Sequence, residues 1–83
     1  MNFEEAIAEL ESNKKKMRFS RMSSICSNFF GKPRAHGTSH HVFKMPWPGD
    51  PRINIQNVKG KVPVYQVEQA IEALRKLQEL KKT

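Results

Sequence analysis

Residues 40–56 read HHVFKMPWPGDPRINIQ, and this stretch decides the fold. Side chains alternate in character over His40–Met45 and again over Arg52–Gln56, which is the period of a strand with one buried face. The three prolines between them predict a stiff loop, because proline cannot donate to a strand ladder. Lys32–Ala35 predicts a short strand before them, with His36–Thr38 as the turn. The sequence therefore predicts a three-stranded antiparallel sheet with one buried face.

Two helices are expected before the sheet. The first spans about residues 2–16, because Asn2 can cap it and Glu5 stands three residues later, as in a capping box. The second spans Ser20–Phe30 and ends at Gly31. Its apolar residues recur at helical spacing; they are Met22, Ile25, Cys26 and Phe29.

The third helix follows Pro63 and runs to Lys82, and its apolar residues recur every three or four positions. These residues are Val64, Val67, Ile71, Leu74, Leu77 and Leu80. The predicted order is α-α-β-β-β-α, an α+β fold with helices packed on the sheet. We divide the chain into an N-terminal helical extension, residues 1–17, and a domain, residues 18–83.

The charge is concentrated in the middle of the chain. Eleven of the 15 basic residues and one of the eight acidic residues lie between Lys14 and Lys61, which gives that segment a net charge of +10. Such a block favours a polyanion, first a nucleic acid and second an anionic membrane, over a merely solvated surface. The single cysteine, Cys26, excludes an intrachain disulfide, and its place on the apolar stripe predicts a buried thiol rather than a nucleophile. No signal peptide or membrane span is evident, so a cytoplasmic protein is expected.

Strand alternation separates the two adjacent histidines. His41 shares a face with the core residue Phe43, whereas His40 shares the opposite, exposed face with Lys44. An exposed histidine among cations suits RNA cleavage, since it can take the proton of the 2′-hydroxyl that attacks the neighbouring phosphate. Nearby cations would stabilise the transition state without a metal. The candidates are Arg34, Lys44 and Arg52.

Two other interpretations concern the same region. A zinc site formed by His36, His40 and His41 is disfavoured, because two of these point to opposite faces and no acid or cysteine completes the ligand set. Trp47 either stacks on a base or packs between its flanking prolines.

The segment from Gly37 to Lys44, GTSHHVFK, follows a helix that ends in Phe29-Phe30-Gly31 and resembles the HicA toxins of bacterial toxin–antitoxin pairs. The resemblance covers about residues 20–80. It implies a double-stranded-RNA-binding-domain-like fold and an mRNA endoribonuclease that needs no cofactor and is neutralised by a HicB-type antitoxin.

The resemblance also implies roles for individual residues. Its catalytic histidine corresponds to His40, supported by Gly37, Ser39 and His41. Thr38 stands between the glycine and the serine, so the motif alone permits either histidine, and strand alternation selects His40. Further phosphate contacts are expected from the basic stretch after the last strand, at Lys59 and Lys61.

Two non-catalytic functions stay open from the sequence. The first is a small basic RNA-binding module that leaves its RNA intact. The second is a structural protein that docks on a partner through the helix within residues 1–17.

Overall fold

The structure, a computed structural model, describes residues 1–36, 39–49 and 51–82. Its elements are α1 (Phe3–Ser12), α2 (Phe19–Phe30), β1 (Arg34–His36), β2 (His40–Lys44), β3 (Arg52–Gln56) and α3 (Val64–Lys81). The strands form one antiparallel sheet in the order β1-β2-β3. The predicted α+β class and the predicted order of elements are confirmed.

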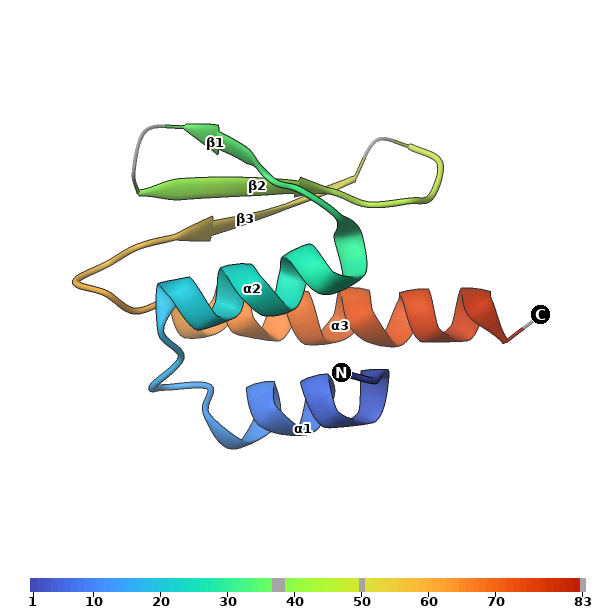
Figure 1. The fold of residues 1–83 in the computed structure, drawn as a ribbon, viewed down its shortest axis with the longest axis horizontal. Helices are drawn as coiled ribbons and strands as arrows, with labels where there is room; N and C mark the ends of the chain where they lie inside the picture. Colours follow the sequence, from blue (N-terminus) through green and yellow to red (C-terminus); the bar gives the residue numbers. More distant parts are fainter. Residues whose placement is uncertain (37–38, 50, 83) are drawn as a thin grey trace.

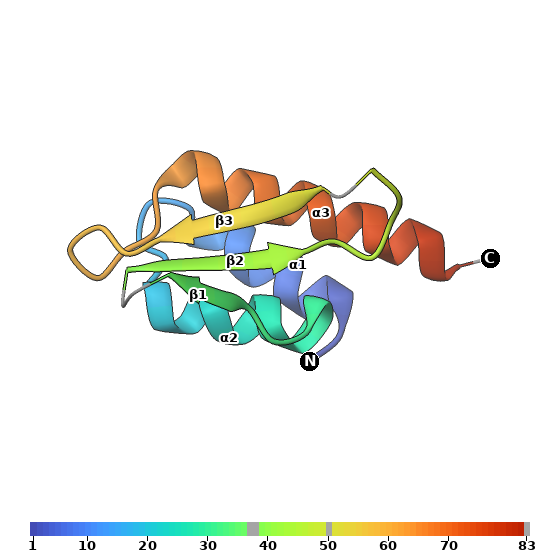
Figure 2. The ribbon, with the colours of Figure 1, turned by 90° about the horizontal axis from the view of Figure 1, so that it is seen from above.

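The elements form three layers, with the sheet on one side, α2 and α3 beneath it, and α1 beyond them (Figure 1). Helix α2 packs on β2 and β3, α3 packs on β3, and α1 packs on α3. Viewed from above, no described helix covers the other face of the sheet (Figure 2). The sheet therefore has one face in the core and one face toward solvent.

The core forms where the inward side chains of the strands meet the helices. Phe43 on β2 pairs with Ile53 on β3, and His41 pairs with Ile55. Phe43, Met45, Ile53 and Ile55 are buried, whereas Lys44 is exposed. The predicted alternation of β2 and β3 is thus confirmed. The helices contribute Ala6, Leu10, Met22, Ile25, Cys26, Val67, Ala70, Ile71, Leu74 and others to the same cluster.

Helix α1 begins as predicted and ends earlier. Asn2 Oδ1 accepts from the Glu5 N–H at 2.8 Å, and Glu5 Oε1 accepts from the Asn2 N–H at 3.4 Å, which completes the capping box. The helix stops at Ser12 rather than at Lys16. Asn13 Nδ2 donates to the Glu9 carbonyl at 2.7 Å, and the chain then makes a separate turn through Lys16. Asparagine competes in this way for helical hydrogen bonds and so ends the helix.

The apolar side of α1 is used within the chain. Ala6 and Leu10 are fully buried, and the Phe3 ring lies 4.8 Å from the Phe29 ring of α2. On the polar side, Arg21 donates to both carboxylate oxygens of Glu9, at 2.6 and 2.7 Å. These hydrogen bonds hold the pKa of Glu9 below its usual range. The division of the chain at residue 17 stays a prediction.

Other boundaries also differ from the sequence-based expectation: α2 begins at Phe19 rather than Ser20, β2 ends at Lys44 rather than Met45, and α3 ends at Lys81 rather than Lys82. Strand β1 begins at Arg34 rather than Lys32, because Pro33 has no N–H to donate, and it includes His36, which pairs with His40 instead of forming the turn.

In α3, two residues of the predicted apolar face, Val64 and Leu80, are exposed. At about 100° of rotation per residue, both lie at the margin of the buried face, and Gln66 takes a buried place near the start of the helix.

The burial of α1 gives a stability prediction. Leu10→Ala removes a fully buried side chain and should lower the free energy of unfolding by about 2–5 kcal/mol, measured by urea denaturation. Leu80→Ala, at a position 48% exposed, is the matched control and should change it by less than about 0.5 kcal/mol. Equal, small effects of the two substitutions would contradict the docking of α1 on the core.

Candidate functional site

The two histidines at the start of β2 lie on opposite faces of the sheet. His41 faces α2 and is half-buried. Its ring lies 4.8 Å from the ring of Phe19, and its Nδ1 shares a hydrogen bond of 2.7 Å with the Ser23 hydroxyl. The expectation that His41 leans on the core is confirmed. Phe19 and Ser23 are contacts that the sequence reasoning did not identify.

His40 lies on the helix-free face, paired across the strands with Gln56. It is half-buried rather than fully exposed. Its Nε2 lies 2.9 Å from Nε2 of Gln56, and its Nδ1 lies 3.4 Å from the hydroxyl of Ser39. The imidazole is therefore oriented by a cross-strand amide, which restricts its rotation.

Behind Gln56 stands Gln66, the one buried polar side chain among the described residues. Gln66 Oε1 accepts from the backbone N–H of Gln56 at 2.8 Å. Gln66 Nε2 donates to Gln56 Oε1 at 3.0 Å and to the Tyr65 hydroxyl at 3.2 Å. All its polar atoms thus have partners, and the first turn of α3 is tied to the edge of β3.

Neither glutamine was singled out from the sequence, although each carries a signal. Gln66 stands on the buried face of α3, four residues before the buried Ala70, where an apolar residue is normal. Gln56 faces His40 once the register of the β2–β3 hairpin is known.

A hollow of about 210 Å³ lies on the same face of the sheet as His40. We call it the basic hollow; it is lined by Lys32, Arg34, Val42, Lys44 and Arg52. Arg34 pairs with Val42 and Lys44 with Arg52, so the strands bring cations from three segments together. The sequence predicted Arg34, Lys44 and Arg52 as phosphate contacts and missed Lys32.

The basic hollow is displaced from His40 along β2. Val42 is two residues from His40 and Lys44 is four, which at about 3.3 Å per residue corresponds to separations of about 7 and 13 Å. Lys44 therefore shares the face of His40 without touching it. A phosphate bound by the cations of the hollow would therefore lie beside His40 along the strand rather than in contact with its imidazole.

The other two predicted phosphate contacts lie in the loop after β3. Val58 and Lys61 form a tight turn through Lys59 and Gly60, which both adopt positive φ, 54° and 87°. Gly60 is needed there, since the left-handed region is open to glycine at no steric cost. The Gly60 carbonyl accepts from the Phe19 N–H at 2.9 Å, which anchors the turn to the start of α2.

This turn lies at the same end of the sheet as the start of β2 (Figure 2). The Asn57 N–H donates to the Ser39 carbonyl at 2.8 Å, which joins the loop to the residue before His40. The five predicted phosphate contacts thus fall into two groups, with Lys59 and Lys61 at the His40 end and the basic hollow farther along the face.

Ser39 is exposed, and its hydroxyl lies 3.4 Å from Nδ1 of His40; its supporting role stays a prediction. Gly37 and Thr38 lie outside the described residues. Within the described part of the chain, no three His, Cys, Asp or Glu side chains gather as they would around a metal ion. His40 and His41 point away from each other, so these two cannot share one ion.

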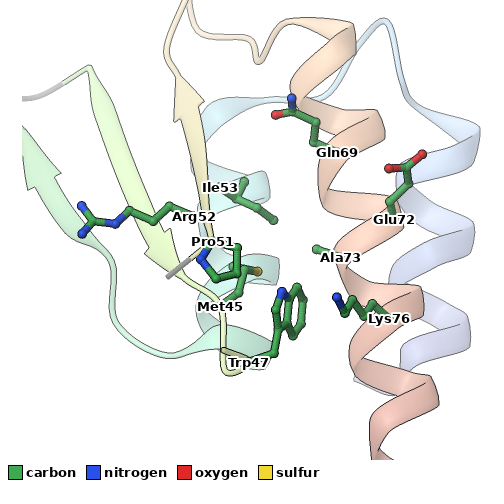
Figure 3. A pocket seen from close by; sticks show the side chains of 9 residues that line it. All are labelled: Met45, Trp47, Pro51, Arg52, Ile53, Gln69, Glu72, Ala73 and Lys76. Carbon is green, nitrogen blue, oxygen red and sulfur yellow. The ribbon is translucent and has the colours of Figure 1, made fainter. Parts of the chain in front are cut away.

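Trp47 lies far from the histidines, in the loop between β2 and β3. It packs against the core, and Lys76 Nζ lies 4.8 Å from the centre of its ring. The two side chains lie next to each other in the lining of a pocket of about 290 Å³ between this loop and α3 (Figure 3). A base stacked on Trp47 would have to share the ring with Lys76. Packing of Trp47 between its flanking prolines stays a prediction, since the contacts shown are with the core and with Lys76.

Cys26 is fully buried on α2, as predicted. Burial raises the pKa of its thiol to about 12, because the apolar surroundings disfavour the thiolate. A thiol that stays protonated near neutral pH is a poor nucleophile. Cys26 is therefore a packing residue of the hydrophobic core.

The chain matches no protein-family model, no curated protein and no solved structure. Its described helices include none with the length and apolar composition needed to cross a membrane. What the protein does must therefore be inferred from the side chains around His40 and the basic hollow.

The raised pKa of Cys26 predicts how stability changes with pH. The unfolded thiol ionises near pH 9 and the native thiol near 12, so the native state is disfavoured as the pH rises between these values. Relative to Cys26→Ala, which lacks the group, wild-type protein should lose roughly 1 kcal/mol of unfolding free energy between pH 8 and 10. A difference between the two proteins that does not change with pH would contradict a buried thiol.

Proposed function

We propose that this chain is a metal-independent RNA endonuclease of the HicA type, with His40 as the general base. The observation that carries the proposal is the position of His40, held in one orientation on a helix-free face that it shares with the basic hollow. A base that is held in place next to a phosphate-binding surface is the minimum that RNA cleavage by its own 2′-hydroxyl requires.

The proposed reaction moves two protons, one to His40 and one to the leaving oxygen, and exchanges one bond at phosphorus. His40 takes the proton of the 2′-hydroxyl as this oxygen attacks the adjacent phosphorus. The bond from phosphorus to the 5′-oxygen breaks, and the leaving oxygen takes a proton from solvent. The products are a 2′,3′-cyclic phosphate and a 5′-hydroxyl. Cations near the phosphate stabilise the extra negative charge that develops there.

The rest of the chain supports binding of RNA on this face. The middle segment carries a net charge of +10, and the basic hollow gathers four of its cations on one surface. Residues 18–83 run helix, three antiparallel strands, helix, with both helices on one face, and we propose that this part is double-stranded-RNA-binding-domain-like. A HicB-type antitoxin is the proposed protein partner, and the cytoplasm is the proposed location.

A second candidate is a non-catalytic RNA-binding module. One observation favours it: the amide of Gln56 already occupies Nε2 of His40, and the basic hollow is centred on other residues of the face. Such a module would bind RNA through the hollow and leave it intact, whatever residue stands at position 40.

The experiment that separates the two candidates is cleavage of single-stranded RNA in the presence of EDTA. Wild-type protein should produce fragments that end in 2′,3′-cyclic phosphate, and His40→Ala should cleave at least about 10²-fold more slowly. Asn54→Ala, an exposed position on the same face, is the control and should keep the wild-type rate. Equal cleavage by His40→Ala and wild type would remove His40 from the mechanism.

A separate prediction concerns the basic hollow. Lys44→Ala removes one cation from it and should reduce the slope of log affinity against log salt by about 1, because one phosphate contact is lost. Lys81→Ala, near the end of α3, removes the same charge outside the hollow and should leave the slope unchanged. Identical slopes for Lys44→Ala and wild type would place the RNA elsewhere on the surface.

A further inference from the structure

Three hydrogen bonds connect the backbone of β3 to the imidazole of His40 through Gln66 and Gln56. The first runs from the Gln56 N–H to Gln66 Oε1, the second from Gln66 Nε2 to Gln56 Oε1, and the third joins Gln56 Nε2 to His40 Nε2. The direction of each bond follows from the one before it.

The backbone N–H of Gln56 can only donate. Because a backbone N–H has no acceptor, the atom of Gln66 that faces it at 2.8 Å must be the carbonyl oxygen, Oε1. The amide nitrogen of Gln66 then points the other way, and its two hydrogens go to Gln56 Oε1 and the Tyr65 hydroxyl. The alternative orientation of Gln66 would set two donors against each other in a buried place.

The orientation of Gln66 in turn determines that of Gln56. The oxygen of Gln56 accepts from Gln66, so its NH₂ group faces His40. An amide nitrogen donates and does not accept. At 2.9 Å, His40 Nε2 must therefore be the acceptor and carry a lone pair instead of a proton.

We infer that Gln66 and Gln56 are positioning residues that fix neutral His40 as the Nδ1–H tautomer and hold Nε2 as its proton-accepting atom. A neutral imidazole has one N–H, so a lone pair on Nε2 puts the proton on Nδ1. Ser39 Oγ lies 3.4 Å from Nδ1, on the side where that proton points. His41 is different, since its partner, the Ser23 hydroxyl, can donate or accept and fixes neither tautomer.

The Nδ1–H form is the less common tautomer, since the neutral imidazole of a free histidine carries its proton mainly on Nε2. The two glutamines therefore select a form that His40 would not prefer by itself. This arrangement also gives Gln56 a place in the reaction. This role of Gln56 rests on the proposed function. In RNA cleavage, the 2′-hydroxyl replaces the Gln56 amide as the donor to Nε2. The lone pair is thus kept unprotonated and correctly directed until the substrate hydroxyl arrives.

The test is ¹⁵N–¹H NMR of the histidine rings at a pH where His40 is neutral, without RNA. Wild-type protein should show a protonated Nδ1 and an unprotonated Nε2 for His40. Gln56→Glu keeps the size of the side chain and puts a carboxylate oxygen against Nε2, so the proton should move to Nε2. Asn54→Asp, on the same face of β3, adds an identical charge two residues away and should leave the tautomer unchanged.

A proton on Nε2 in the wild type, or an unchanged tautomer in Gln56→Glu, would overturn the inference. Gln66→Met, which removes the orienting amide, should give a mixture of tautomers, and circular dichroism checks that it is folded. With saturating RNA, Gln56→Glu should lower kcat by about 10²-fold or more, whereas Asn54→Asp should affect KM alone. The tautomer and its switch without any cleavage by wild type would uphold the two positioning residues and reject the nuclease.

Discussion

The backbone N–H of Gln56, on the edge strand of the sheet, is the donor on which the polar chemistry of this protein depends. Among the described residues no strand lies beyond β3 to accept from this N–H, and Gln66 of α3 supplies the acceptor inside the core. Leaving that N–H unpaired would cost about 1–3 kcal/mol, which explains a glutamine on an otherwise apolar helix face. Because Gln66 also orients the Gln56 amide, the group that satisfies the backbone N–H of β3 is the same group that sets the proposed tautomer of His40.

The period of two along β2 is the reason why much of the site could be predicted from the sequence. Phe43 must be buried, so His41 follows it toward α2 and His40 faces the helix-free side. The same alternation in β3 buries Ile53 and Ile55 and leaves Arg52 and Asn54 exposed. Strand bounds set by alternation, as in β3, were predicted correctly, whereas β1 was misplaced because Pro33 and a short strand give little periodic signal.

The residues that the sequence did not reveal are those whose role needs tertiary contacts. Gln66 meets Gln56 across ten residues, and Ser23 meets His41 across eighteen. Neither pair is implied by local spacing, and the basic hollow gains Lys32 only because the chain crosses from α2 to the edge of the sheet. The end of α1 was missed for a local reason, since the side chain of Asn13 competes for a helical carbonyl.

The central claim is that RNA binds on the helix-free face with its 2′-hydroxyl directed at Nε2 of His40. Chemical-shift mapping tests it most directly, with an RNA in which a methylene group replaces the bridging 5′-oxygen, so that the 2′-hydroxyl is kept and the chain cannot be cleaved by this route. The largest changes should fall on the Ser39 and His40 backbone, on the side-chain amide of Gln56 and on residues of the basic hollow. Changes confined to α1, or to the pocket between Trp47 and α3, would contradict the claim.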